Sequence, residues 1–260
     1  MADQSAAPPR ALPDPMQLDW GDLRHALSQG WRDFLAEPWY GIALSAVYVA
    51  CGWLLVFAFT TKGQVWWTLP ASAGFPILGP FIACGFYEIS RRREAGAPMV
   101  LREVLGVVFR QKDRQIPSMA AVIVVFFLFW NFLSHMIFAL FLGKATMTNV
   151  STSLAVFATP EGLAMLAFGT AVGAVFAGVL FCLTVVSLPM LLDREVDFVT
   201  AMITSFQLVL LNPVVLLSWG ALIAVCLFAG MLPGFLGLLV VLPVFGHATW
   251  HLYRRALDWG

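Results

Sequence analysis

Charged side chains are scarce in this chain of 260 residues. Asp, Glu, Lys and Arg together make up 12% of it, while apolar residues make up 60%. Because about a quarter of a soluble domain is charged, this composition excludes an ordinary soluble protein. The mean hydropathy of +0.83 is typical of a chain embedded in a bilayer. Fifteen basic and fifteen acidic side chains balance each other, which argues against a nucleic-acid partner.

The sequence also lacks the motifs of common enzymes and metal sites. We find no P-loop, GxGxxG, HExxH or GxSxG motif, so we expect a protein that is not an enzyme and has no cofactor. The cysteines lie in apolar runs without CxxC spacing, which supports neither a disulfide framework nor a metal site. They are Cys51, Cys84, Cys182 and Cys226.

The N-terminal region has no basic segment followed by an apolar core, so no cleavable signal peptide is evident. Residues 1–17 are rich in proline and are expected to form a disordered cytoplasmic tail. Residues 18–260 are expected to form a single polytopic membrane domain.

Long uncharged runs predict an all-α integral membrane fold. A helix needs about 20 apolar residues to cross the hydrocarbon core, and helical hydrogen bonding satisfies its backbone there. The uncharged run 198–253 is long enough for two crossings. The runs predict six transmembrane helices near 39–60, 69–89, 117–141, 162–191, 213–231 and 233–253.

The distribution of basic residues predicts the orientation. Thirteen lysines and arginines fall before the first span, between spans two and three, after span four or after span six. Only Lys62 and Lys144 fall on the other side. This bias predicts a multi-pass protein of the bacterial inner membrane with both termini in the cytoplasm.

An internal repeat is suggested by matches at an offset of 175 residues. Asp22, Ala26, Trp31, Pro38 and Cys51 align with Asp197, Ala201, Phe206, Pro213 and Cys226. Pro80, Arg91 and Arg92 align with Pro243, Arg254 and Arg255 at an offset of 163. A fainter middle copy runs from Leu101 to Pro117. We therefore expect three parallel hairpin repeats.

Each repeat is expected to begin with an amphipathic helix in the cytoplasmic interface. Apolar residues of the segments 22–38 and 197–213 share one helical face. A proline follows each helix, and Asn212 is expected to cap the span after the second one. In the outer loops, Trp66 and Trp67 suit an interfacial aromatic belt, and Thr159 suits the cap of span four.

Four strings in the sequence carry a family resemblance. They are GWRDF at Gly30–Phe34, PMLLDR at Pro189–Arg194, LNP at Leu211–Pro213 and GHATWHLYR at Gly246–Arg254. The chain resembles the uncharacterised bacterial membrane family called domain of unknown function 2189, from about residue 18 to the end. Some members carry a name that links them to cytochrome c oxidase subunit I, which implies an association with a respiratory complex. With only His135, His247 and His251 in spans, an oxidase core lacks support.

A polar cluster is expected at the cytoplasmic end of the bundle. His247 and His251 share a face of span six, and in the repeat alignment they match Cys84 and Glu88. Glu88, His247 and His251 are therefore expected to converge, with Asp193 and Arg194 at a similar depth. We favour a hydrogen-bonded clamp between helices over a metal, haem or proton-relay site, because an interface position does not require full burial.

Two smaller polar groups favour structural roles. His135, with Asn131 and Ser134 on span three, is expected to bond a neighbouring helix. The arginines 91–93 are mainly a topology signal, with binding of anionic headgroups as the alternative.

Two function classes compete. The favoured one is a structural, accessory or assembly partner of a membrane complex, which is a respiratory complex if the family's name is a guide. The alternative is a small-solute transporter or channel, for which the prolines around span two are compatible. A binder of haem or metal through His247 and His251 is the third hypothesis. The bilayer and other membrane subunits are the expected partners.

Overall fold

The structure, a computed structural model, describes residues 13–62, 68–110, 115–143 and 157–258. These residues form helices throughout, apart from one pair of very short strands. The helices are α1 (Trp20–Ala36), α2 (Pro38–Lys62), α3 (Thr68–Glu94), α4 (Leu101–Arg110), α5 (Ile116–Leu142), α6 (Pro160–Thr184), α7 (Ser187–Asp193), α8 (Phe198–Leu211), α9 (Pro213–Met231) and α10 (Leu238–Ala256).

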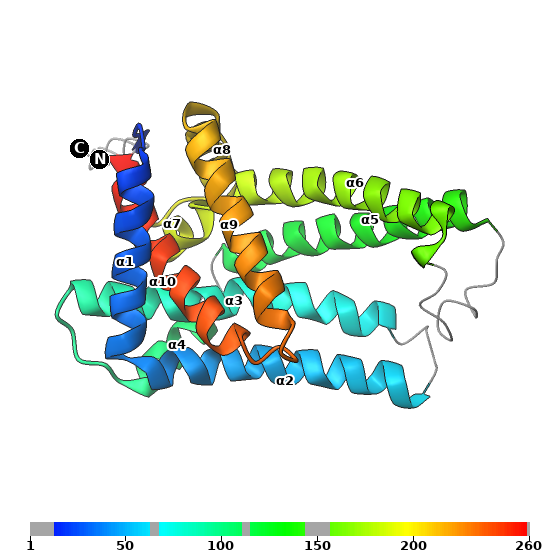
Figure 1. Cartoon of the computed structure of the whole chain (residues 1–260). Coiled ribbons are helices and arrows are strands. Elements are labelled where there is room, and N and C mark those ends of the chain that lie inside the picture. The colour runs from blue at the N-terminus through cyan, green and yellow to red at the C-terminus, as the bar shows by residue number, and fades with distance from the viewer. Residues whose placement is uncertain (1–12, 63–67, 111–114, 144–156, 259–260) are drawn as a thin grey trace, which may run out of the picture.

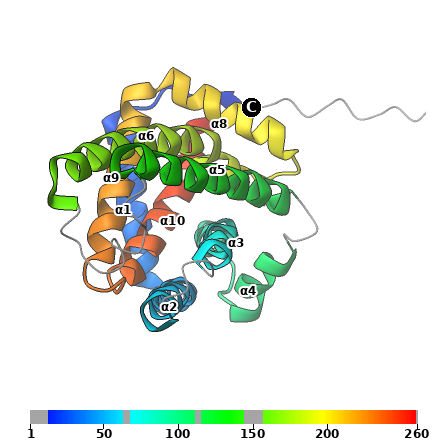
Figure 2. The same ribbon diagram turned by 90° about the vertical axis from the view of Figure 1, so that its right-hand side faces the viewer.

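Three two-helix hairpins occur along the chain, each after a shorter helix, and a further short helix, α7, lies between the second hairpin and α8. The hairpins are α2–α3, α5–α6 and α9–α10, and the shorter helices before them are α1, α4 and α8. Figure 2 looks almost along α2 and α3, and shows α5 and α6 lying across them. In Figure 1, α1 stands across the ends of α2 and α3, and α10 runs diagonally behind it.

The helices confirm an all-α membrane fold, but not the six predicted spans. Three segments of the described chain are long and apolar enough to cross a bilayer: Ile116–Leu142, Pro160–Asp193 and Pro213–Met231. A fourth results if α1 and the start of α2 count as one bent span. The predicted spans 69–89 and 233–253 are not among them. Helix α3, which covers the first of these, ends in three arginines and a glutamate. Helix α10 starts only at Leu238 and includes two histidines and two arginines, which lower its hydropathy.

Residues 13–17 of the predicted disordered tail have a defined structure. Residues 1–12 lie outside the described residues, but residues 13–17 are placed against the other end of the chain. Strand β1 (Asp14–Pro15) pairs antiparallel with β2 (Leu257–Asp258). The Met16 N–H also donates to the Ala256 carbonyl at 2.9 Å. The proline-rich composition suggested disorder, whereas long-range backbone hydrogen bonds hold this segment in place.

Capping side chains and prolines set the helix ends. Asp19 and Asp22 form a capping box at the start of α1, and Asp197 caps α8 through the Thr200 N–H. Thr159 accepts from the Gly162 N–H at 3.1 Å, which confirms its predicted role. Trp66 and Trp67 of the predicted aromatic belt lie outside the described residues.

Prolines mark two breaks between a shorter helix and a long one. Between α1 and α2 the chain bends by 97° just before Pro38. The chain also turns between α8 and α9 at Pro213 (Figure 2). Proline fits the first turn of the new helix, where an N–H would have no partner.

Asn212 does not cap α9 with its side chain as predicted. Its Oδ1 accepts from the Leu18 N–H at 2.7 Å, and its Nδ2 donates to the Met16 carbonyl at 2.9 Å. The Asn212 amide therefore fixes the N-terminal segment to the corner between α8 and α9. This contact spans 194 residues of sequence, so a local pattern could not reveal it.

The largest core lies where α1, α3, α7, α8 and α10 meet. Met190, Leu208, Trp250, Leu252 and Tyr253 are fully buried there. By contrast, only 17% of the apolar window is buried in each of α5 and α9. The long helices therefore present apolar side chains outward, as helices that face lipid do.

Candidate functional site

Asp33 is the centre of a polar cluster, here called the Asp33 cluster, formed by Asp33, Ser90, Arg93, His247 and His251. Asp33 is on the face of α1 that packs against α10, and 5% of it is exposed. Its Oδ2 accepts from the Nε2–H of His251 on α10 at 2.8 Å. Its Oδ1 accepts from Nε of Arg93 on α3 at 2.7 Å. One carboxylate thus connects three helices.

The hydrogen bonds to Asp33 stabilise its charged form. Burial alone would raise the pKa of the Asp33 carboxyl. Hydrogen bonds from His251, Ser90 and Arg93 outweigh burial and lower the pKa to about 2. The side chain is therefore a carboxylate at neutral pH, and its bonds to the imidazole and the guanidinium are charge-assisted.

His247 extends the cluster into the interior between α10 and α3. It is fully buried, and its Nδ1 lies 2.9 Å from Ser90 Oγ and 3.1 Å from the Phe86 carbonyl oxygen. A carbonyl only accepts, so the bond to Phe86 requires the hydrogen on Nδ1. Nε2 of His247 has no hydrogen-bond partner among the described residues. The imidazole serves mainly to join α10 to α3.

Glu88 forms a second polar group on α3. Its side chain is fully buried, and Oε2 accepts from Arg91 Nε at 2.7 Å while Oε1 accepts from Arg92 Nε at 2.8 Å. Arg92 also pairs with Glu103 of α4 and donates to the Pro98 carbonyl at 3.0 Å. Glu88 therefore neutralises the arginines that precede the α3–α4 loop and helps to fix α4.

Asp193 and Glu94 receive bonds from the end of α10. The Tyr253 hydroxyl donates to Asp193 Oδ2 at 2.9 Å, and Arg254 approaches the same oxygen at 3.8 Å. Glu94 accepts from Trp250 Nε1 at 3.0 Å and from Arg254 Nε at 3.1 Å. These contacts anchor the last turns of α10 to α7 and to the end of α3.

Small residues let the helices of this junction approach closely. A Cβ added to Gly30 would lie 2.6 Å from both the Ala248 nitrogen and the Val244 carbonyl oxygen. A Cβ on Gly246 would lie 2.5 Å from the Phe86 ring. Glycine is therefore required where α1 crosses α10 and where α10 crosses α3, and the approach brings Asp33 within reach of His251.

The predicted convergence of Glu88 with His251 is wrong. Glu88 bonds to Arg91 and Arg92 of its own helix, and His251 bonds to Asp33. His247 does reach α3, at Phe86 and Ser90, which are two residues before and after Glu88. Asp193 and Arg194 lie beside the end of α10, in contact with each other at 3.4 Å. The favoured interpretation, a clamp that joins α10 to its neighbours, agrees with these contacts, although most of the partners differ.

Sequence reasoning missed Asp33, Ser90, Arg93 and Glu94. Asp33 did lie within the GWRDF string, beside Gly30, and the GHATWHLYR string contains both histidines. Each of these two strings combines a glycine with polar residues at helical spacing. This shared feature was the signal in the sequence that the two segments pack against each other. Their pairing across 218 residues could not be derived from spacing alone.

The polar group on α5 is local. His135 Nδ1 donates to the Asn131 carbonyl at 2.7 Å, and the Ser134 hydroxyl donates to the same oxygen at 2.8 Å. These contacts do not include the predicted bond from His135 to a neighbouring helix. Within the described residues, no group of three or more His, Cys, Asp and Glu side chains is arranged to hold a metal ion.

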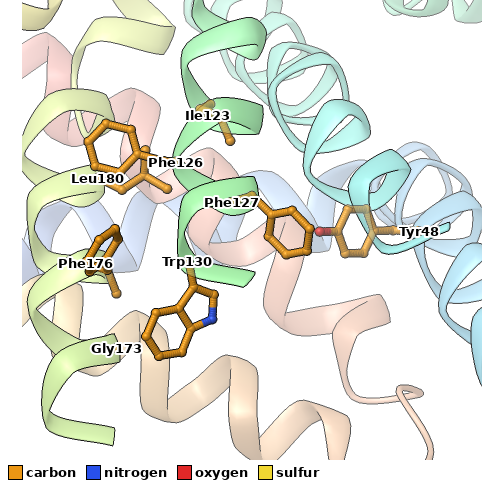
Figure 3. A pocket seen from close by; sticks show the side chains of 9 residues that line it. Tyr48, Ile123, Phe126, Phe127, Trp130, Gly173, Phe176 and Leu180 are labelled. Carbon is orange, nitrogen blue, oxygen red and sulfur yellow. The ribbon is translucent and has the colours of Figure 1, made fainter. Parts of the chain in front are cut away.

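An apolar groove lies between α2, α5 and α6, with a volume of about 450 Å³ (Figure 3). Its lining is aromatic and aliphatic, with Tyr48 of α2 on one side and Trp130 of α5 and Phe176 of α6 on the other. Trp130 packs on Gly173, where an added Cβ would lie 3.0 Å from the indole. Gly173 thus gives room to an aromatic side chain of the neighbouring helix.

The fold and these contacts define an all-helical integral membrane protein with several apolar helices and a polar junction at one end. Residues 68–193 match the model of the family described as predicted integral membrane protein (DUF2189), which confirms the family resemblance predicted from the sequence. The matched segment includes α3 to α7, whereas the strings around Gly30 and Gly246 lie outside it. No curated protein and no solved structure matches the chain.

Proposed function

We propose that this protein is a non-enzymatic accessory or assembly subunit of a membrane complex. A respiratory complex is the specific candidate that the family resemblance implies. The Asp33 cluster carries this proposal, because Asp33 bonds to Arg93 and His251 and so joins α1, α3 and α10. These bonds fix the arrangement of the helices, and in this arrangement the apolar helices face outward.

We further propose a six-span topology in the bacterial inner membrane with both termini cytoplasmic. Three consecutive units, each a shorter helix followed by a hairpin, support this arrangement, as does the thirteen-to-two distribution of basic residues. The interfacial helices of the proposed repeats are then α1, α4 and α8. The first and third hairpins are the critical ones, because α3 and α10 are less apolar than the other helices of the hairpins.

A transporter and a haem protein are the competing functions. The groove between α2, α5 and α6 is lined by apolar side chains, which suits lipid or a protein surface better than a polar solute. His247 and His251 have partners from α3 and α1 through one ring nitrogen each, which suits a clamp.

Purification in native-lipid nanodiscs tests the accessory role against these alternatives. We expect the protein to co-purify with a stoichiometric membrane partner, and the same partner to be cross-linked from a photoreactive residue at an outward position such as Phe132 of α5. An absorption band of haem in the pure protein would instead establish the haem function. Solute flux in liposomes that contain only this protein would establish the transporter.

Cysteine labelling tests the topology separately. In a background that lacks the four native cysteines, Ala95→Cys should react only with reagent from the cytoplasm and Ala158→Cys only from outside. Leu236→Cys, in the turn between α9 and α10, should react from outside if the third hairpin crosses the bilayer. Protection or cytoplasmic reaction of Leu236→Cys, with the other two sites as expected, would leave four spans.

A further inference from the structure

Helix α1 has one buried face and two different outward flanks. Leu23, Ala26, Gly30 and Phe34 are buried, chiefly against α10. The residues of the first outward flank recur at helical spacing, and this flank is amphipathic. It consists of Trp20, Arg24, Trp31 and Leu35, with Trp20, Trp31 and Leu35 exposed by 52%, 45% and 58%. The second flank carries His25, Gln29 and Arg32 and is polar throughout.

The bend before Pro38 sets the direction of α1. The axes of α1 and α2 differ by 97°, so α1 lies parallel to the membrane surface if α2 crosses the bilayer as proposed. Trp39, on the first turn of α2, is 79% exposed at this corner. Indole side chains favour the boundary between headgroups and acyl chains. The tryptophan flank and the corner therefore suit contact with the membrane, and the second flank suits contact with water.

Arg24 and Arg32 of α1 differ from the arginines of the junction, and Arg24 is the one that lies beside the tryptophans. Arg93 pairs with Asp33, Arg255 with Asp22 and Arg254 with Glu94. Among the ion pairs that the structure describes, none involves Arg24, which is exposed between Trp20 and Trp31 on its flank. A guanidinium in this setting matches a phosphate, because its fork of N–H groups bonds phosphate oxygens and its stem extends along apolar surface.

We propose that the Trp20–Arg24–Trp31–Leu35 flank of α1 binds anionic phospholipid of the cytoplasmic leaflet, with Arg24 on the phosphate and the indoles at the acyl-chain boundary. This rests on the proposed topology, which places α1 at that leaflet. Helix α8 provides an internal contrast, because it also precedes a hairpin and presents an outward stripe, but that stripe is Val199, Ile203, Phe206 and Leu210. Since α8 contains no Lys or Arg, its stripe should show no preference for anionic lipid.

Native mass spectrometry of the full-length protein, purified in detergent and delipidated, tests this site. Phosphatidylglycerol and phosphatidylcholine are titrated separately onto the wild type, Arg24→Gln and the matched control Arg32→Gln. Each arginine is exposed and each substitution removes one charge, so both variants should fold. We expect Arg24→Gln to lower the preference for phosphatidylglycerol about fivefold and Arg32→Gln to leave it unchanged, since one basic residue near an anionic surface contributes about that factor.

Two further arms identify the source of the effect. Trp31→Ala should weaken both lipids to a similar extent, because the indole contacts the acyl-chain boundary rather than the charge. Inorganic phosphate should not displace phosphatidylglycerol, because the apolar contacts come from the lipid. Equal losses in the two arginine variants, or no preference in the wild type, would overturn the lipid site. If Ala95→Cys reacts with reagent from outside, the proposed topology is wrong. The lipid titration is made in detergent and does not depend on that result.

Discussion

The junction of α1, α3 and α10 and the hairpin of α5 and α6 are held together by different forces. In the junction, glycines bring the backbones close and a buried carboxylate bonds an imidazole and a guanidinium. In the hairpin, aromatic rings do most of the packing: Phe176 of α6 lies against Phe126, Phe129 and Trp130 of α5, with ring centroids 5.8–6.3 Å apart.

This difference shows which region depends more strongly on exact geometry. Hydrogen-bonded ions tolerate little change in distance or direction, so the junction accepts one arrangement of its three helices. Aromatic side chains beside an open groove have room to adjust. We therefore expect the junction to respond more strongly to substitution than the hairpin.

The largest effect is expected from filling a glycine. Gly30→Leu places atoms against the backbone of α10, which cannot move aside, and should cost about 4 kcal/mol or more. Gly173→Leu meets the far end of the Trp130 ring, which can swing toward the groove, and should cost about 1–2 kcal/mol. Thermal unfolding in detergent measures both. Equal losses would remove the distinction between the two regions.

The sequence predicted the hairpin better than the junction, for a physical reason. The helices α5 and α6 follow from uncharged runs, a Thr cap and first-turn prolines, all of which are local signals. The junction depends on which distant polar side chains meet, and the repeat alignment paired Glu88 with His251 incorrectly. Glu88 found arginines three and four residues away, while Asp33 reached His251 because Gly30 allows α1 to approach α10.

The extent of the spans was also only partly predictable. Hydropathy identified the long apolar runs, but it could not show that α10 begins at Leu238, or that its polar half packs against α1. The same polar residues that stabilise the junction lower the apolar character of that helix. A lipid-facing hairpin can be predicted from composition, whereas a polar junction requires the tertiary fold.

A double-mutant cycle tests one contact of the junction, the bond between Asp33 and His251. Asp33→Ala and His251→Ala should each destabilise the protein by about 2–3 kcal/mol, because each leaves a buried partner poorly satisfied. The double mutant should lose less than the sum, with a coupling of about 1–2 kcal/mol. The matched cycle of Glu88→Ala with His251→Ala should be additive within about 0.5 kcal/mol, since Glu88 bonds to other residues. Coupling in the second cycle and additivity in the first would restore the pairing expected from the repeat.

The smallest expected effect is a difference in how the stability of the two regions depends on pH. The Asp33 carboxyl has a pKa of about 2 in the folded protein, below the 3.8 of an unperturbed aspartate. A group with a lowered pKa stabilises the fold fully above its unfolded value and loses that contribution as the pH falls toward its folded value. The window is therefore about pH 4 down to pH 2, and the loss across it is about 2 kcal/mol.

Asp33→Asn tests this contribution, because the amide has nearly the same shape and does not titrate in that window. His251, Arg93 and His247 face Asp33 and are kept in both proteins, so the difference in stability between wild type and Asp33→Asn isolates the carboxylate. This difference, from denaturation in detergent at a series of pH values, should shrink as the pH falls from 4 to 2. The hairpin variant Gly173→Leu should shift the stability by the same amount at every pH, because it changes packing without a charge. If the wild type and Asp33→Asn lost stability in parallel, the carboxylate would contribute no more to the junction than an uncharged side chain of its shape.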